Sequence, residues 1–310
     1  MNLNVMTLTK LFMKMERNIS MGNILSAISN VIANPVVELK EFYSSRNRAN
    51  SMGEALESYV KDVFADTLNE TNERKRLERF EQVFSYTGNQ NNPPDVMIRG
   101  GDAIEVKKIE SQGSQLALNS SYPKAKIFSD SSMITNACRD CEDWTEKDII
   151  YTVGVVKGNK FKKLFFVYGV DYAASEEVYQ RIKNTISDGL HMIPNVELAE
   201  TNEIGRVNRV DPLGITYLRV RGMWGIENPS KVFSYVYTPQ DSDFEMVAII
   251  NDDKYFSFSD EERLKFQILM STNHNFKDDA DHRCTIEDIK IKTPDNPSIL
   301  KPAKLITFRR

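Results

Sequence analysis

Residues 93–108 read PPDVMIRGGDAIEVKK, and the pattern of this stretch decides the fold that the sequence predicts. DVMI and DAIEVKKIE are typical of strands, and the Arg-Gly-Gly at 99–101 is typical of a hairpin turn between them. Alternate side chains of a strand share a face, so Glu105 and Lys107 should lie side by side. The hairpin should bring Asp95 next to both of them. The sequence therefore predicts two carboxylates and one ammonium in a single cluster.

Such a cluster favours metal-assisted hydrolysis of a phosphodiester. Two neighbouring carboxylates raise each other's pKa unless a cation lies between them. Oxygen ligands suit Mg²⁺, which takes one or two carboxylates from a protein and keeps several waters. We therefore expect Asp95 and Glu105 to bind Mg²⁺, and Lys107 to orient or help deprotonate a water and to stabilise charge on a phosphate. The alternative is an exposed hairpin whose charges face water, because the spacing alone is a weak signal.

A helix before this hairpin offers a third carboxylate. Ser51 and Glu54 have the spacing of a capping box, and apolar residues at helical spacing predict a helix over 52–66 with one buried face. Glu54 has a structural role in that box. Glu57, one turn later on the side of Leu56, has none, and a carboxylate there is costly unless it reaches a cation or water. We expect Glu57 to be an accessory acidic residue of the cluster, the alternative being an ordinary surface glutamate.

The order of the remaining elements indicates an α/β fold of the mixed α+β kind, with a central mixed sheet flanked by helices. DIIYTVGVV and KLFFVYGV should form a second hairpin around residues 157–160. Helices are expected over residues 21–34, 52–66, about 130–142 and about 175–189. From residue 196 onward the pattern is more irregular, with strands expected near 215–222, 232–237 and 245–250.

Composition excludes several classes of protein. The chain has 310 residues, 41% of them hydrophobic and 27% charged, with a mean hydropathy of −0.43, which is typical of a globular protein. No window approaches eighteen consecutive apolar residues, so a membrane span is not expected. The first twenty residues lack the cleavage site of a secretory signal. Three cysteines cannot form a disulfide framework, which indicates a reducing compartment, and we expect a cytoplasmic location.

The cysteines also raise the possibility of zinc. Cys138 and Cys141 form one C-x-x-C, but a structural zinc site needs four ligands. Only Cys284 and His282 could complete the set, about 140 residues further on. We therefore expect buried or idle thiols.

A local basic segment stands out from an acidic chain of net charge −4. Residues 205–221 hold four arginines against one carboxylate, Asp211. Arginine is well shaped for bidentate contact with guanine, so two such strands would suit a site made of G·C pairs. The alternative is a solvated hairpin whose arginines pair with carboxylates. The residues expected to contact DNA are Arg206, Asn208, Arg209, Arg219 and Arg221, with Arg46, Arg48, Lys124 and Lys126 as further phosphate contacts or plain surface.

Asp95, Glu105 and Lys107 resemble the PD-(D/E)XK signature of nucleases. Longer stretches are similar to the NgoPII-type family of type II restriction endonucleases and spread over about residues 30–310. These stretches are RNRANSMGEALESYVKD, VFSYTGNQNNPPDVMIRGGDAIEVKKIES, LALNSSYPKAK and GRVNRVDPLGITYLRVRGMWGIENP. The resemblance implies a restriction-endonuclease-like core that makes Mg²⁺-dependent double-strand cuts in DNA at a short palindrome. The expected site is GGCC, cut to blunt ends with a 5′ phosphate and a 3′ hydroxyl.

This resemblance also implies a domain organisation and partners. We expect an extension over 1–20, a nuclease core over 21–195 and a DNA-recognition region over 196–310, unless these parts form one compact domain. A palindrome is most simply read by a homodimer in which each subunit cuts one strand, the alternative being a monomer that cuts twice. A DNA methyltransferase should protect the prokaryotic host. Rival functions are a structure-directed or repair nuclease of the same fold, an inactive DNA-binding module, and a thiol or zinc regulator.

Overall fold

A nine-stranded mixed sheet forms the centre of the protein. The computed structural model describes residues 22–46, 48–89, 92–201, 203–273 and 283–310, so the predicted extension over 1–20 lies outside the described residues. The strand order is β1-β2-β3-β6-β7-β12-β14-β13, and β5 pairs with β6. The strands are β1 (Phe84–Tyr86), β2 (Val96–Ile98), β3 (Ala103–Ile109), β5 (Lys126–Phe128), β6 (Glu146–Lys157), β7 (Lys160–Tyr168), β12 (Glu245–Asn251), β13 (Arg283–Lys292) and β14 (Leu300–Arg309).

Helices cover this sheet, as the sequence predicts for a mixed α/β fold. Two pairings are parallel, β3 with β6 and β7 with β12, and the others are antiparallel. The predicted fold class is therefore confirmed. The helices are α2 (Ile24–Ala33), α3 (Leu39–Ser44), α4 (Met52–Ala65), α5 (Glu73–Val83), α6 (Asn136–Arg139), α7 (Gly169–Tyr172), α8 (Glu176–His191), α9 (Pro229–Val232), α10 (Asp252–Ser257) and α11 (Asp260–Asn273).

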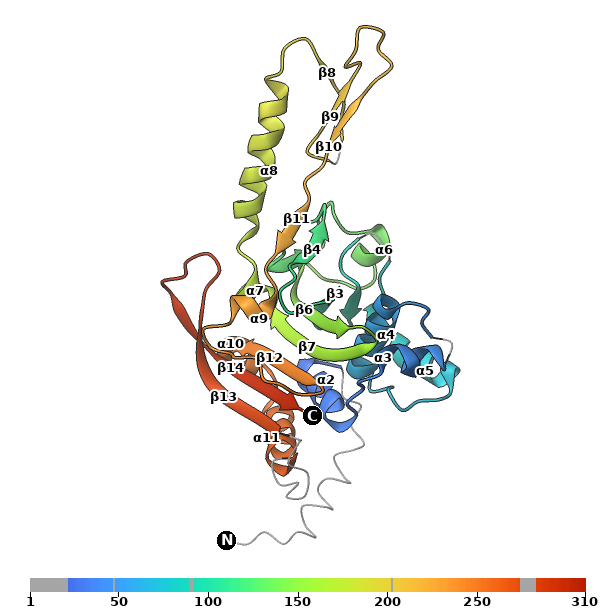
Figure 1. Cartoon of the computed structure of the whole chain (residues 1–310), viewed down its shortest axis with the longest axis vertical. Helices are drawn as coiled ribbons and strands as arrows, with labels where there is room; N and C mark the ends of the chain where they lie inside the picture. The colour runs from blue at the N-terminus through green and yellow to red at the C-terminus, as the bar shows by residue number, and fades with distance from the viewer. Residues whose placement is uncertain (1–21, 47, 90–91, 202, 274–282) are drawn as a thin grey trace.

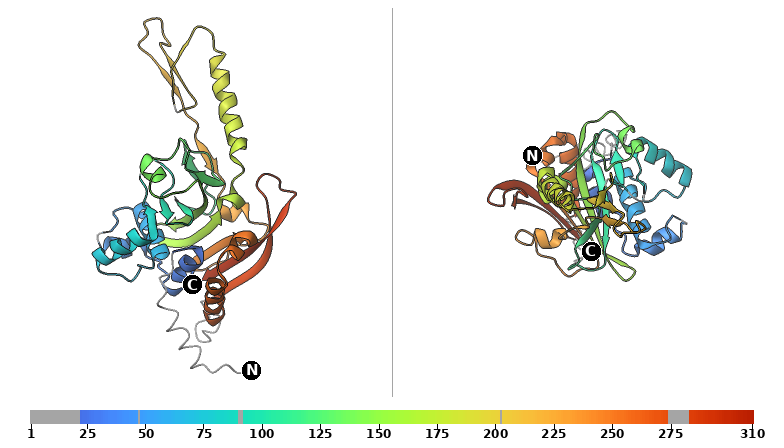
Figure 2. Two further views of the ribbon diagram at one scale, coloured as in Figure 1. Left: turned by 180° about the vertical axis from the view of Figure 1, so that it is seen from behind. Right: turned by 90° about the horizontal axis from the view of Figure 1, so that it is seen from above.

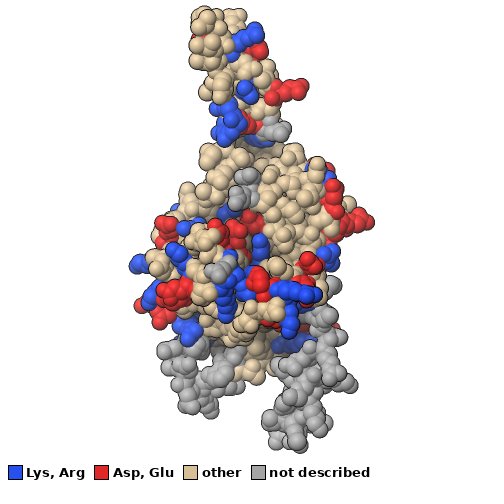
Figure 3. All heavy atoms as spheres, turned by 90° about the vertical axis from the view of Figure 1, so that its right-hand side faces the viewer, with Lys and Arg blue, Asp and Glu red and all other residues tan. Residues whose placement is uncertain are grey.

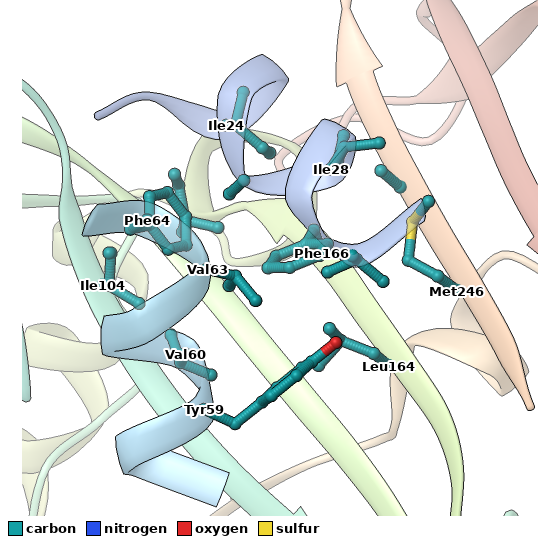
Figure 4. Close-up of a cluster of buried hydrophobic side chains, with 14 of the residues drawn as sticks. Ile24, Ile28, Tyr59, Val60, Val63, Phe64, Ile104, Leu164, Phe166 and Met246 are labelled. Carbon is teal, nitrogen blue, oxygen red and sulfur yellow. The ribbon is translucent and has the colours of Figure 1, made fainter. Parts of the chain in front are cut away.

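Each face of the sheet has its own hydrophobic core. One core lies under α2 and α4 and includes Ile104 and Val106 of β3. Figure 4 shows α4 and α2 side chains directed onto Leu164 and Phe166 of β7. The second core lies on the opposite face and includes Ala103 of β3. Strand β3 is thus held between two cores, which fixes the direction of every side chain along it.

The predicted helix over 52–66 is confirmed as α4, although its cap differs from the prediction. The Ser51 side chain accepts a hydrogen bond from the Glu54 amide at 3.2 Å, as expected. The Glu54 carboxylate accepts from the Asn50 amide at 2.8 Å rather than from the amide of Ser51. Only half of the predicted capping box therefore forms. The helix ends at Asp66, whose φ of 56° is left-handed.

A narrow arm rises from this body (Figures 1 and 2). We define the arm as residues 176–223. It consists of α8 and a three-stranded sheet of β8 (Glu197–Leu198), β9 (Gly205–Asn208) and β10 (Leu218–Val220). The chain returns through β11 (Trp224–Ile226), which pairs with β4 (Leu116–Asn119) at the base of the arm. No residue of α8 is buried, so the arm is supported mainly at its base.

The structure corrects two predicted elements. The strand expected near 232–237 is wrong, because α9 and the turns after it occupy this part of the chain. The Asn228 side chain caps α9, and the amides of Phe233 and Tyr237 each donate to the carbonyl four residues earlier, at 2.9 Å, which is the hydrogen-bonding of helical turns rather than of a strand. Both rings reach the second core from these turns. The helix expected over about 130–142 is only the single turn α6.

The recognition region predicted over 196–310 is divided in space. Its first part forms most of the arm, whereas β12, β13 and β14 belong to the same sheet as β1 to β7. Among the described residues, no helix has the length and apolar content needed to cross a membrane.

A matched pair of tyrosines tests the core under α4. The buried Tyr43 hydroxyl donates to Asp62 at 2.8 Å, whereas the buried Tyr59 hydroxyl has no partner among the described residues. Tyr43→Phe should therefore lower the free energy of unfolding by about 1.5–3 kcal/mol, and Tyr59→Phe should leave it unchanged or raise it. Urea unfolding of both variants measures this, and equal losses in the two would contradict the assignment.

Candidate active site

The predicted hairpin forms and places Asp95 opposite β3. Strands β2 and β3 pair antiparallel, with Val96 facing Ile104, and the turn between them contains Gly100 at a φ of +62°. Such a left-handed φ favours glycine. Asp95, just before β2, donates its amide proton to the Ile104 carbonyl at 3.1 Å. The predicted strands and the turn between them are confirmed.

The Asp95 carboxylate is held against β3 by one short hydrogen bond. Its Oδ2 atom accepts from the Val106 amide at 2.6 Å. Burial, together with the charge of Glu105, raises the pKa of Asp95 to about 7, although Lys107 and the Val106 amide oppose this rise. The site therefore keeps two carboxylates close together in a poorly solvated place.

Glu105 and Lys107 lie on one face of β3, as the alternation predicts. The Lys107 ammonium is 2.6 Å from Oε1 of Glu105. Burial lowers the pKa of Lys107, but the charges of Glu105 and Asp95 outweigh burial and raise it overall. The other carboxylate oxygen, Oε2 of Glu105, is buried and has no hydrogen-bond partner among the described residues. A buried carboxylate oxygen without a partner is costly, which indicates that something absent from the protein chain binds it.

A divalent cation fits this arrangement. The free oxygen of Glu105 and the Asp95 carboxylate, whose pKa is raised, supply hard oxygen ligands of the kind that Mg²⁺ takes from a protein. A cation between them would remove the repulsion that raises the pKa of Asp95. Asp95 and Glu105 are the residues that would hold it. The described residues contain no group of three or more acidic, histidine or cysteine side chains placed to bind a metal, so water or DNA would complete the coordination.

Glu57 lies on α4 near this cluster, but it is exposed, unlike the costly position expected from its place beside Leu56. Its charge contributes to raising the pKa of both Asp95 and Lys107, so it is part of the electrostatic surroundings of the cluster. Its role as an accessory acidic residue stays a prediction.

Lys61 is a nearby cation that the sequence reasoning missed. It follows Glu57 by four residues, so both lie on the same side of α4. Burial lowers the pKa of Lys61, and the charges of Glu57 and Asp95 oppose that shift. Its ammonium donates to the Thr87 carbonyl at 3.1 Å. The spacing from Glu57 was the signal that could have identified it.

The five residues predicted to contact DNA lie on the arm. Arg206 of β9 and Arg219 of β10 face each other in the antiparallel register, and both are exposed. Val207, between Arg206 and Asn208 along β9, is buried on the other face. Arg206 and Asn208 therefore share the outer face, and the Arg206 guanidinium donates to Asn208 at 3.2 Å. Figure 3 shows Lys and Arg side chains on the arm, interspersed with a few Asp and Glu.

Three of these arginines form ion pairs with carboxylates of the arm. Glu203, two residues before the basic segment considered above, forms ion pairs with Arg219 and Arg221, each at 2.5 Å. Arg209 lies 3.5 Å from Glu197. The local positive excess is therefore smaller than the count over 205–221 indicates. The ion pairs also fix the direction of the guanidinium groups.

The cysteines predicted as an alternative zinc site lie on opposite faces of the sheet. Cys138 is in the second core, where its thiol donates to the Met97 sulfur at 3.2 Å, and Cys284 is in the core under α2 and α4. These two cores are separated by the sheet, so the thiols cannot share one metal ion. His282, the fourth ligand considered, lies outside the described residues.

Comparison with known proteins identifies the family. The model of the NgoPII restriction endonuclease family matches residues 22–292. The chain belongs to this family. A relative from Neisseria gonorrhoeae, "Type II restriction enzyme NgoPII", is 54% identical over 288 residues, which are 92% of this chain and 99% of the relative. A search of solved structures finds no match. The predicted family, and with it the class of restriction endonuclease, is confirmed.

Asp95 generates a prediction about stability in metal-free protein. An unfolded aspartate loses its proton near pH 4, whereas burial raises the pKa of Asp95 to about 7, so between these values the folded state binds the extra proton. Stability should therefore fall as pH rises from about 4 to 7. In EDTA at pH 8, Asp95→Asn should melt roughly 2–4 °C above wild type, with no difference near pH 4.

Thermal melts across this pH range measure the effect. Asp143→Asn, which removes an exposed carboxylate, is the control and should follow the wild-type curve. Parallel curves for wild type and Asp95→Asn would contradict the assigned surroundings of Asp95.

Proposed function

We propose that this restriction endonuclease cuts both strands of duplex DNA by hydrolysis that uses Mg²⁺, Asp95, Glu105 and Lys107. The observation that carries this proposal is the β2–β3 hairpin, which holds two carboxylates and an ammonium together and leaves one carboxylate oxygen without a partner. Bound Mg²⁺ would polarise the scissile phosphate and lower the pKa of a water. The relative's printed name, a type II restriction enzyme, supports the same activity for this chain.

The residues of the site have separate tasks in this reaction. Asp95 and Glu105 hold the cation, and the Val106 amide keeps Asp95 turned toward it. The Lys107 ammonium, 2.6 Å from Glu105, can donate a hydrogen bond to the attacking water or to a phosphate oxygen as negative charge develops. The water attacks phosphorus in line with the leaving 3′ oxygen, which gives a 5′ phosphate and a 3′ hydroxyl. Glu57 adds negative charge at the edge of the site.

We place DNA recognition on the arm. Arg206 and Asn208 of β9 and Arg219 of β10 lie on the exposed face of the arm's sheet, with Arg221 just after β10, and the arm projects from the body (Figure 1). Arginine is well shaped for contact with guanine, which supports a recognition site made of G·C pairs. The family resemblance implies GGCC as this site, cut to blunt ends. Recognition would then belong to the arm, and β12 to β14 of the predicted region 196–310 would support the core.

We also propose a homodimer that reads the two halves of the palindrome, with a methyltransferase protecting the same site in the cytoplasm of a prokaryotic host. Three apolar side chains spaced four residues apart on α8 support this assembly. Val178, Ile182 and Ile186 are 40%, 45% and 46% exposed, which is unusual for a stripe on one helix face unless another surface covers it. A monomer that cuts the two strands in turn is the alternative.

Lys107 provides the sharpest test of the chemistry, because its neighbour Lys108 is a matched control. Lys108 lies on the other face of β3 and pairs with Glu110. Lys107→Ala should lower the rate of plasmid cleavage in Mg²⁺ by at least about 100-fold, and Lys108→Ala should leave it within about twofold.

Agarose gels of a plasmid of known sequence, digested in Mg²⁺ and in EDTA, measure this. Fragments that end at GGCC would support GGCC as the recognition sequence, and discrete fragments with other ends would show that the enzyme recognises a different sequence. A smear would support a repair-type nuclease instead. Tight binding without any cleavage by the wild type would support an inactive DNA-binding module.

Arg219 tests the recognition role of the arm. Arg219→Ala should weaken binding to a duplex that contains the site by about 5- to 150-fold, because a bidentate base contact contributes about 1–3 kcal/mol. Binding to a duplex without the site should change much less. Arg74→Ala, at an 88% exposed arginine on α5, is the control. Fluorescence anisotropy in EDTA measures both affinities, and equal losses on the two duplexes would contradict base reading by Arg219.

A further inference from the structure

Lys124 is a buried cation between the active site and the base of the arm. It is only 8% exposed, although a surface lysine was one expectation for it. Its backbone amide donates to the Tyr151 hydroxyl at 2.7 Å. Its ammonium lies 4.4 Å from the centre of the Tyr122 ring and 3.4 Å from the Met133 sulfur. Neither contact is with an oxygen, so among the described residues this buried ammonium has no strong acceptor.

Glu105 and Lys124 line the same small cavity. This cavity has a volume of about 20 Å³, enough for one water molecule, and Ser121 and Tyr151 also line it. Oε2 of Glu105 is buried and without a partner among the described residues. A cavity lined by a glutamate with an unpaired oxygen and by a lysine whose ammonium donates to a sulfur, a weak acceptor, is polar enough to retain a water.

We propose that Lys124 is a positioning residue of the nuclease site, and that it binds Oε2 of Glu105 through a water in this cavity. The inference rests on the proposed function for its effect on cleavage, but the contact itself does not. Glu105 would then be held from two sides, by Lys107 at Oε1 and by the Lys124-bound water at one lone pair of Oε2, which leaves the other lone pair of Oε2 for the cation. A carboxylate fixed in this way cannot rotate out of the site, which is how a supporting residue contributes to the chemistry of another.

The charges around Lys124 agree with this contact. The pKa of Lys124 is lowered to about 8, chiefly by burial and to a smaller extent by Lys183, against the opposing charges of Glu105 and Glu176. Of the two carboxylates, Glu105 raises the pKa of Lys124 more than Glu176 does. Glu176 also accepts a hydrogen bond from the Tyr122 hydroxyl and from the Gln180 amide, so it has other partners. Glu105 is thus the acidic group whose free oxygen Lys124 can satisfy.

The base of the arm fixes the place of Lys124. The Tyr122 ring beneath its ammonium stacks on Tyr179 of α8, with ring centres 5.7 Å apart. Trp224 of β11 packs edge-on against both rings. The elements that carry the arm therefore also hold the cation that faces Glu105. A shift of α8 or β11 when DNA occupies the arm would be transmitted to Lys124 through these three rings.

A double-mutant cycle in metal-free protein tests the contact without any cleavage. Lys124→Met keeps the length of the side chain and removes its charge. It should lower the melting temperature of the wild type more than that of Glu105→Gln, because the contact is already weakened in the second background. Lys162→Met is the matched control, since the Lys162 ammonium lies 3.4 Å from the carboxylate of Asp243 instead. Its effect should be the same in both backgrounds.

Cleavage gives the second readout. Lys124→Met should lower the single-turnover rate about 10- to 100-fold, as loss of a supporting contact to a metal-binding side chain does, and leave the affinity for the site duplex in EDTA within about twofold. Lys162→Met should change neither value. If Lys124→Met does not fold, Lys124→Gln replaces it in the same cycle.

The outcomes separate this inference from the proposed function. Equal melting shifts for Lys124→Met in both backgrounds, or an unchanged single-turnover rate, would overturn the role of Lys124 while the enzyme still cuts. If the wild type cuts no DNA but the melting shifts are unequal, the Lys124–Glu105 contact stands and the proposed function fails.

Discussion

The register between β2 and β3 is the constraint on which the rest of the site depends. It is fixed by the hydrogen bond from the Val106 amide to the Asp95 carboxylate and by hydrophobic cores on both faces of β3. A slip of one residue would turn Glu105 and Lys107 into the core under α4 and place apolar side chains where the charges now lie. Because that exchange is prohibitive, the sheet can hold two repelling carboxylates at close range without their moving apart.

The body and the arm are stabilised in different ways. The body buries its elements on both faces of a nine-stranded sheet, whereas α8 of the arm buries none of its residues. The arm is instead stabilised by local contacts. Glu203 forms ion pairs with Arg219 and Arg221, and the rings of Tyr179 and Trp224 pack together at the base of the arm. In the proposed function, the sparsely buried arm can adjust to a DNA groove while the β2–β3 hairpin stays rigid.

The sequence reasoning succeeded where neighbours along the chain decide the structure. The hairpin, the two faces of β3 and the helix α4 follow from alternation, turn residues and a cap. It failed where distant residues decide. Glu203 lies 16 residues from Arg219, and the cavity brings Lys124, in the loop before β5, close to Glu105 of β3, so no local sequence pattern predicts either contact. The segment 232–237 has strand-forming residues, but burial of Phe233 and Tyr237 in the second core overrides that propensity.

The central claim is that one hairpin performs the chemistry while the arm reads the bases. A crystal structure of the protein with a GGCC duplex and Ca²⁺, another dication that binds oxygen ligands, would test both halves at once. The account predicts an ion bound by Asp95 and Glu105 beside the scissile phosphate, and Arg219 in the groove of the recognised base pairs. An arm turned away from the DNA, or a scissile phosphate remote from Lys107, would contradict it.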